Sequence, residues 1–565
     1  MEQKNFNPST RLFVISVLSV LVITLIVYLP ALKNGFINWD DTHYITENLH
    51  IRSLDIGWLF TGVVAANWHP LTMLSHTVDF ALWNMNPWGH HLTSVILHAL
   101  NTALVYMVTF RLISIAQKNT DNKITGRVIA GAAAALLFGL HPLHVESVAW
   151  VSERKDVLSA FFYLIAILLY LQYAARGAAK KALYYVMSLI VFALALMSKP
   201  MAVSLPIVLL LIDFYPLDRL KHMRGIIIEK IPFFLLTILS AIVTIWAQHK
   251  GEAIQSLKLY TLTDRIVLPA RAYIFYLYKM IIPLNLSPIY PRPPEAGILN
   301  LPAVISFLIL ASITAFCVIK SKKRFLLALW LFYLLTLLPV VGIIKVGDVA
   351  MADRYAYLPS VGPFILAGLG LALVMKKAGG RPLKAFLIIT AASILVIFAL
   401  MTRAQTRVWK GPITFWSEII RVYPERVPIA YNKRGITYAK KGEFNKAAAD
   451  LTMAIELVED KAYPYFNRAS VFTSLGRYEE AIKDFSAIIT IDPKSTKVYY
   501  ERGRLYEKTG RYEEALRDFK KVVALQPDFA EGYMDAARIY STLGDAESAT
   551  RYREKAKAVF LKKGL

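Results

Sequence analysis

Long apolar runs separated by short basic loops are the feature that most constrains the fold of this chain. A membrane-spanning helix needs roughly 20 apolar residues, because its backbone polar groups must be satisfied within the segment. Such runs continue to about position 402, and the chain becomes charged after Tyr423. We therefore expect an all-α, polytopic membrane domain. The expected crossings, about eleven, lie near 12–32, 91–114, 128–143, 157–174, 182–198, 201–217, 231–248, 300–319, 325–343, 358–375 and 383–402.

The composition supports a membrane protein and argues against nucleic-acid binding. Hydrophobic residues make up 56% of the chain and charged residues 18%, against about 25% charge in soluble domains. The formal net charge of +24 comes largely from loops between apolar runs, where membrane orientation explains it. No zinc-finger spacing, RNP-like signature or basic helix accompanies these cations. We expect no nucleic-acid partner.

The basic loops also predict the orientation, because cytoplasmic loops carry the excess of Lys and Arg. The clusters lie before the first run and at 118–127, 176–181, 219–230, 320–324 and 376–384. All of these clusters fall on the cytoplasmic side only if 264–284, which contains Arg271 and Lys279, lies at the outer surface instead of crossing the membrane. The N-terminus is then cytoplasmic and the C-terminal region lies outside, in the periplasm if the chain is bacterial. If 264–284 crosses, either the C-terminal region is cytoplasmic or 320–324 faces outward.

The C-terminal region contains an internal repeat with the 34-residue period of tetratricopeptide (TPR) repeats. Glycines, alanines and aromatic residues each keep this register. The glycines are Gly442, Gly476, Gly510 and Gly544, and the alanines are Ala447, Ala481, Ala515 and Ala549. We expect about four repeats over 428–565, the last of them divergent and capping. A linker over 411–427 should join them to a membrane domain over 1–410.

The first expected outer loop, 33–90, contains the adjacent carboxylates Asp40 and Asp41. Neighbouring carboxylates repel, so one should have a raised pKa unless a cation lies nearby. Such a pair suits a general base or a metal ligand, and a divalent cation is left open. The alternative is a solvated turn in which an Asp caps a helix.

Further polar residues fall at the outer ends of other runs. His144, Glu146 and Arg154 lie in the second outer loop, where the histidine spacing fits no standard zinc site. Lys199, Asp353 and Arg354 lie close to the hydrocarbon, where charges are costly and become functional hypotheses. Arg and Lys would suit a lipid-linked phosphate, although Lys199 could also snorkel.

Several of these runs, in sequence order, resemble the transmembrane and TPR-containing family of O-mannosyltransferases. The runs are 67–72, 89–99, 141–149, 154–158 and 353–360. This family belongs to the C-type glycosyltransferases, whose members use polyprenyl-phosphate sugars. Because the TPR array is short, the chain looks like a bacterial relative, which would place it in the inner membrane.

The resemblance implies roles for the outer residues. One of Asp40 and Asp41 would deprotonate or position the acceptor hydroxyl, with Asp41 slightly preferred because it is further from Trp39. Arg354, Lys199 and Arg154 would hold the donor phosphate. The remaining candidates are Glu146 as a second acid, together with His43, His69, His144 and Asp353.

The expected function is transfer of a sugar from a polyprenyl-phosphate carrier to a protein hydroxyl or a glycan on the outer face. The expected partners are this donor, membrane lipid, and a protein in the TPR groove. No cofactor is predicted with certainty. Three alternatives stay open: a non-enzymatic TPR scaffold, a transporter of lipid-linked glycans, and a ligase that transfers a whole glycan.

Overall fold

The computed structural model describes residues 8–117, 124–175, 180–251, 262–291, 300–320, 323–342 and 351–562. These residues form helices joined by short loops, with two isolated bridges and no strand among them. The all-α prediction is confirmed. The chain divides into two compact units, Met1–Phe415 (unit 1) and Trp416–Leu565 (unit 2).

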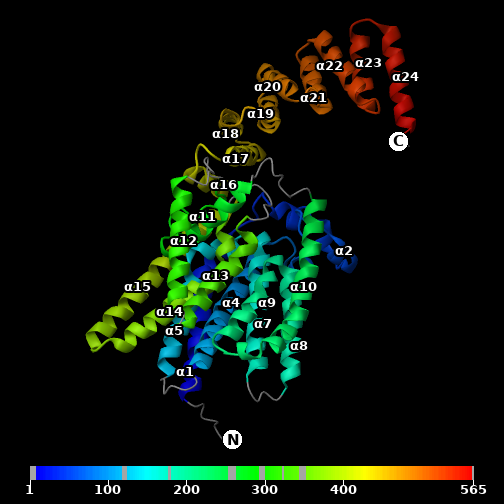
Figure 1. Cartoon of the computed structure of the whole chain (residues 1–565). Coiled ribbons are helices and arrows are strands. Elements are labelled where there is room, and N and C mark those ends of the chain that lie inside the picture. The colour runs from blue at the N-terminus through cyan, green and yellow to red at the C-terminus, as the bar shows by residue number, and fades with distance from the viewer. Residues whose placement is uncertain are drawn as a thin grey trace. The chain divides into compact units, whose positions relative to one another are not determined.

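Unit 1 contains the apolar helices (Figure 1). Its α-helices are α1 (Pro8–Tyr28), α2 (Ile56–Thr61), α3 (Pro70–Trp83), α4 (Pro87–Ala116), α5 (Ile124–Leu140), α6 (Val145–Ala149), α7 (Arg154–Ala174), α8 (Lys181–Ser198), α9 (Leu205–Phe214), α10 (Met223–Lys250), α11 (Leu262–Ile281), α12 (Leu301–Ile319), α13 (Arg324–Leu337), α14 (Val361–Lys377) and α15 (Arg381–Thr406). Helix α16 (Pro412–Val422) bridges the division between the units.

Several of these helices are suited to cross a membrane. Among the described residues, 7 helices are long and apolar enough, or 8 if α5 and the segment Pro142–Ala149, bent by 53°, form one span. Two shorter apolar helices are Pro200–Phe214 and Arg324–Val340. Every expected crossing overlaps a helix of the described residues, and these long apolar helices are those of an integral membrane protein. The number that cross stays a prediction.

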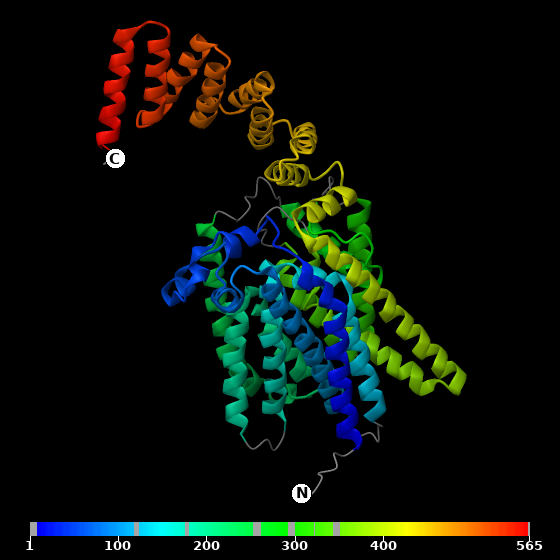
Figure 2. The ribbon, with the colours of Figure 1, turned by 180° about the vertical axis from the view of Figure 1, so that it is seen from behind.

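Burial distinguishes the centre of unit 1 from its lipid-facing helices. Within the most apolar stretch of each helix, 56% is buried in α4 and 61% in the span Val151–Ala174. In Arg381–Lys410 only 6% of that stretch is buried. Apolar surface that the protein itself does not cover is the surface expected to face lipid. The two buried spans therefore form the centre of the bundle, and α15 lies at its edge (Figure 2).

Helix α11 packs at the end of the bundle where α5 and α13 terminate. The Tyr273 hydroxyl donates to the carbonyl of Leu334, near the end of α13, over 2.9 Å. The His141 ring, just after α5, bonds the Met280 carbonyl at 3.0 Å. This position agrees with 264–284 lying at the outer surface, and that placement stays a prediction.

A glycine on α14 permits close contact with α5, as small residues commonly do between membrane helices. A Cβ built on Gly368 would come within 2.3 Å of the Ala130 carbonyl oxygen. Gly368→Ala is expected to lower the free energy of unfolding by about 1–3 kcal/mol, because backbone atoms must move apart. Thermal unfolding in detergent measures this.

Gly370→Ala on the same helix is the matched control, since a Cβ there meets nothing within 4 Å. We expect it to leave stability unchanged or slightly higher, because Ala favours helix. Equal unfolding temperatures for the two variants would show that the α5–α14 contact is not tight.

Unit 2 consists largely of paired helices. These are α17 (Pro428–Lys440), α18 (Phe444–Leu457), α19 (Ala462–Ser474), α20 (Tyr478–Ile491), α21 (Thr496–Lys508), α22 (Tyr512–Leu525), α23 (Ala530–Thr542) and α24 (Ala546–Lys562). The four repeating glycines follow the first helix of each pair with φ of 77°, 74°, 75° and 85°, a left-handed conformation that glycine adopts at low cost. The repeating alanines are buried. The predicted TPR array is confirmed.

A repeating ion pair in unit 2 was missed by the sequence analysis. Each of three arginines forms two hydrogen bonds to an aspartate sixteen positions later. The pairs are Arg434 with Asp450, Arg468 with Asp484, and Arg502 with Asp518. The arginines and the aspartates repeat with the same period as the glycines. The repeat pattern in the sequence therefore already indicated these ion pairs. A bidentate pair joins the two helices of a repeat with a defined geometry.

Candidate active site

The two adjacent aspartates occupy different environments. The Asp41 carboxylate is buried and accepts hydrogen bonds from the backbone N–H of Ile37 (2.7 Å), the backbone N–H of Ser152 (3.0 Å) and the Ser152 hydroxyl. Burial raises the pKa of Asp41 to about 6, although these hydrogen bonds oppose the shift. Asp41 therefore fixes the loop that follows α1 against the segment Val151–Glu153.

Asp40 is only partly buried, and no described residue forms a hydrogen bond or ion pair with its carboxylate. Burial raises its pKa, whereas the nearby positive charge of Lys155 lowers it. Asp40 is thus a carboxylate with free lone pairs beside a cation. Such a group can accept a proton from a bound ligand.

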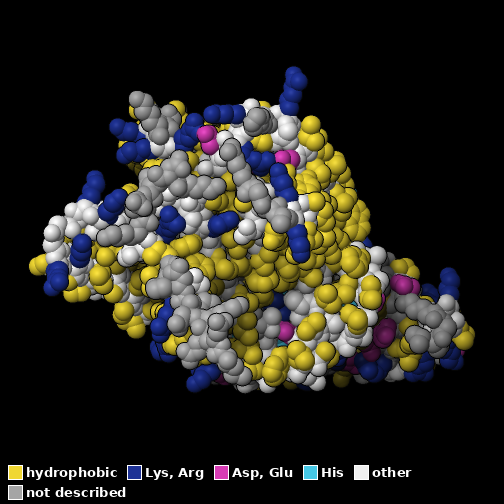
Figure 3. Space-filling view, turned by 90° about the horizontal axis from the view of Figure 1, so that it is seen from below, with side chains coloured by type: hydrophobic (Ala, Val, Ile, Leu, Met, Phe, Trp, Pro, Cys, Tyr) yellow, Lys and Arg dark blue, Asp and Glu magenta, His cyan; other side chains and the backbone are white. Residues whose placement is uncertain are grey.

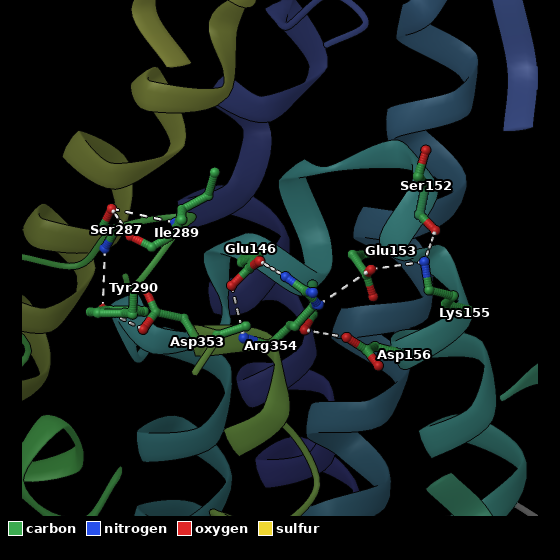
Figure 4. Close-up of polar contacts among 12 residues, drawn as sticks. Glu146, Ser152, Glu153, Lys155, Asp156, Ser287, Ile289, Tyr290, Asp353 and Arg354 are labelled. Atoms are coloured by element: carbon green, nitrogen blue, oxygen red, sulfur yellow. Dashed lines mark hydrogen bonds and ion pairs between the residues drawn. The ribbon is translucent and has the colours of Figure 1, made fainter. Parts of the chain in front are cut away.

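Next to Asp40, helix ends bring together a buried cluster of acids and bases (Figure 4). Arg354, in the turn Asp353–Ala356, contacts Glu146 of α6 at 2.5 Å through its guanidinium and at 2.9 Å through its backbone N–H. Its Nε also lies 3.4 Å from Glu153. The Arg354 side chain keeps 12% exposure.

Glu153 is the centre of the cluster because three cations contact it. Besides Arg354, the ammonium groups of Lys155 and Lys199 lie 2.8 Å and 3.3 Å from its carboxylate. Lys199 also pairs with Asp156, which accepts a hydrogen bond from Ser147 at 2.9 Å. Buried charges are tolerated only when paired and hydrogen-bonded. These contacts hold the cations in fixed positions.

Asp353 is buried beside this cluster. The Tyr290 hydroxyl donates to its carboxylate over 2.7 Å. Burial and the neighbouring Glu146 charge raise its pKa well above the usual range. This arrangement positions the turn that carries Arg354.

Arg154 lies in a separate buried network. Its guanidinium pairs with Asp79 at 2.5 Å and donates to the His90 carbonyl over 2.6 Å. Asp79, His76 and His90 place potential metal-binding atoms within 4.8 Å of one another. Arg154 already neutralises Asp79, and a divalent ion would add two positive charges to a buried site. The structure does not bring Arg154 into contact with Arg354 or Lys199, the other two residues expected to hold phosphate.

The three candidate histidines lie in different surroundings. His43 is exposed near Asp40, whereas His69 is buried. The His144 ring bonds the Phe138 carbonyl at 2.7 Å and the Ser360 hydroxyl at 3.0 Å. Both ring nitrogens of His144 are therefore occupied by hydrogen bonds within the protein. His43 therefore lies close to Asp40, and His69 lies close to Lys155, Lys199 and Glu153.

Among the cluster residues, Glu153, Lys155 and Asp156 were not predicted as site residues from the sequence. A signal was present, because two acids and two bases lie together over 153–156 just before an apolar run. Charges at such a position are costly unless paired. The run therefore indicated partners elsewhere in the chain without identifying them.

Comparisons with known proteins agree with this architecture. Family models described as tetratricopeptide repeat and TPR repeat match residues 496–529 and 469–510. A Caenorhabditis elegans protein O-mannosyl-transferase is 23% identical over 437 residues, which cover 74% of this chain and 59% of that protein. Human protein O-mannosyl-transferase TMTC3 is 23% identical over 445 residues, covering 71% of this chain and 46% of the relative. Human protein O-mannosyl-transferase TMTC4 is 24% identical over 430 residues, which cover 68% of this chain and 56% of that protein.

The chain spans about half the length of the curated relatives it matches. Among solved structures, a crystal structure of MamA is 23% identical, with a TM-score of 0.26, and covers 27% of this chain and 88% of that chain. The resemblance stated from the sequence is confirmed: this TPR-containing membrane protein is similar over about 70% of its length to proteins named as protein O-mannosyl-transferases.

Proposed function

We propose that this chain is a membrane glycosyltransferase that moves a sugar from a polyprenyl-phosphate carrier to an acceptor hydroxyl at the outer face. The observation that carries the proposal is the free carboxylate of Asp40 beside the buried cations of the cluster. The names of the curated relatives support the transferase activity. The donor class follows from the family resemblance and from the chemistry of the cations.

Asp40 is the proposed base, which reverses the slight preference for Asp41 drawn from the sequence. It takes the proton of the acceptor hydroxyl as the oxygen attacks the anomeric carbon of the donor. The bond from this carbon to the phosphate oxygen breaks, and polyprenyl phosphate leaves. Asp41 accepts three hydrogen bonds from its own surroundings, so its lone pairs are less available.

Arg354 and Lys199 are proposed to bind the leaving phosphate. Both keep part of their surface exposed, 12% and 11% of the side chain, and a guanidinium binds phosphate through two parallel hydrogen bonds. Cations held in place by Glu146, Glu153 and Asp156 need little rearrangement when charge develops on the phosphate. Such preorganisation is a large source of catalysis.

The basic loops support the proposed orientation, with the N-terminus in the cytoplasm and unit 2 in the periplasm of a bacterial inner membrane. Helices α1 and α8 begin at the same end of unit 1 (Figures 1 and 2). Arg11 and Lys181 are exposed near these starts. Viewed from that end, Lys and Arg side chains are scattered over the face and Asp and Glu are few (Figure 3). Cytoplasmic faces carry this bias.

The TPR array is proposed to hold a protein acceptor or partner, as extended solenoid surfaces commonly do. A pocket of about 290 Å³ lies between α17, α18 and α19 and has a mixed apolar and polar lining that includes Ile436, Asn467 and Ser470. A peptide segment could place an apolar side chain there and hydrogen-bond to Asn467. This surface belongs to unit 2 alone.

The donor class is tested by supplying purified protein in detergent with radiolabelled sugars on polyprenyl phosphate. A periplasmic or membrane extract serves as the source of acceptor, and matched nucleotide sugars are the control donors. We expect label to pass from one polyprenyl-phosphate sugar to a macromolecule. Label taken only from nucleotide sugars would refute the donor class, and no transfer from any donor would favour the scaffold or transporter alternatives.

The pH dependence of the transfer rate should follow the ionisation of Asp40. A base must be ionised, so the rate should rise with pH through the raised pKa of Asp40. Lys155 lowers that pKa, and Lys155→Gln is therefore expected to move the rising limb of the pH–rate profile to higher pH. Rates measured from about pH 4 to 8 check this. A limb that stays in place or moves to lower pH would contradict the assignment of Asp40.

A further inference from the structure

A second concentration of positive charge lies outside the proposed active site. The short helix Leu29–Lys33 after α1 and the segment Arg407–Lys410 after α15 border a pocket of about 490 Å³. Its lining includes four cations and no acid. The cations are Lys33, Arg403, Arg407 and Lys410.

These cations are not neutralised by the described part of the chain. None of them forms an ion pair there, in contrast to the cluster around Glu153. Arg403 makes one weak hydrogen bond, to the Ile26 carbonyl at 3.4 Å, and all four side chains are exposed. Like charges that converge on one pocket repel, and an anion bound between them relieves the repulsion.

The floor of the pocket is rigidly built. The buried Asn34 side chain donates to the Thr406 carbonyl over 3.0 Å. The backbone N–H of Gly35 donates to the Lys410 carbonyl, also over 3.0 Å. Two segments 372 residues apart in the sequence are therefore joined at this pocket. The backbone segments that carry the cations are consequently held together by the fold.

Apolar surface continues from this pocket along α1 and α15. Ile26 and Leu29 are 51% and 50% exposed, and Leu400 is 62% exposed. Exposed apolar surface of this kind on spanning helices faces lipid tails. The pocket thus lies where two lipid-facing helices end, which is the depth at which lipid headgroups lie.

We infer that this pocket binds the phosphate of an anionic membrane phospholipid whose acyl chains lie along α1 and α15. A headgroup with net negative charge reduces the repulsion between the four cations, and the acyl chains cover the exposed apolar side chains. The lining of this pocket contains none of the residues Asp40, Lys199 and Arg354. The lipid site is therefore built from other residues than the proposed active site, and its test does not depend on transfer activity.

The test is native mass spectrometry of the full chain in detergent, titrated with phosphatidylglycerol or, as a neutral-headgroup probe, phosphatidylcholine. We expect the first retained lipid to be phosphatidylglycerol, bound at least about tenfold more tightly, since each nearby cation strengthens anionic-lipid binding severalfold. Arg403→Gln combined with Arg407→Gln should remove this preference. Arg403→Lys with Arg407→Lys should keep most of it and shows that the fold tolerates changes there.

The matched control is Lys377→Gln combined with Arg381→Gln, which removes two exposed cations where α14 ends and α15 begins. This control should bind phosphatidylglycerol as the native chain does. Equal loss in both double variants, or equal binding of the two lipids by the native chain, would overturn the proposal. Complete displacement of phosphatidylglycerol by millimolar inorganic phosphate would identify a small-anion site and would overturn the lipid assignment as well.

Discussion

Asp40→Asn is expected to lower the rate of sugar transfer by about 10²–10⁴-fold, the usual contribution of a general base. The amide keeps the shape of the carboxylate but cannot accept the proton of the acceptor hydroxyl. Because the Asp40 carboxylate has no hydrogen bond or ion pair with the described residues, the free energy of unfolding should change little. Initial rates with saturating donor, together with thermal unfolding, measure both effects.

Asp41→Asn is the matched comparison, since it makes the same chemical change at the neighbouring position. Its amide nitrogen would face the N–H donors that now bind the carboxylate. We expect a loss of about 1–3 kcal/mol in stability, typical of an unsatisfied buried group, and a smaller loss of rate than at Asp40. The reverse pattern, an active Asp40→Asn and an inactive but stable Asp41→Asn, would exchange the two roles.

Arg354→Gln is expected to abolish transfer and to lower the free energy of unfolding by about 3–5 kcal/mol. The stability loss arises because Glu146 is left buried without its cation. The activity loss arises because the donor phosphate loses its bidentate ligand. Transfer and unfolding assays on the same preparation measure the two losses.

The double variant Glu146→Gln with Arg354→Gln separates these causes. Removing both charges should recover much of the stability, because no buried charge is left unpaired. Transfer should stay absent if Arg354 binds phosphate. A double variant that is stable and transfers at the native rate would show that the pair is structural only.

Much of the fold could be predicted because its signals are local. Apolar runs located the helices of unit 1, and the register of Gly442 and its repeats identified the TPR array. The pairing of Arg468 with Asp484 followed the same register but required attention to charged residues as well as to small ones. Periodic patterns can be read from sequence because each repeat meets the same neighbours.

The active-site candidates were predicted less completely, because their roles depend on contacts between distant segments. The sequence identifies Asp40 and Asp41 as a pair, and only the fold shows that Ser152 binds one of them. Glu153 gains its importance from Lys199 and Arg354, which lie 46 and 201 positions later. The sequence makes Arg154 a candidate phosphate ligand, and only the fold shows that Arg154 pairs with Asp79.

The central claim is that sugar is transferred at Asp40 with the donor phosphate on Arg354 and Lys199. It is tested most directly by an experimental structure of the full chain bound to a non-hydrolysable phosphonate analogue of the polyprenyl-phosphate sugar. The account predicts the phosphonate within hydrogen-bond distance of both cations, and the anomeric carbon on the side facing the Asp40 carboxylate. A phosphonate bound away from Arg354 and Lys199, with Asp40 remote from the sugar, would contradict it.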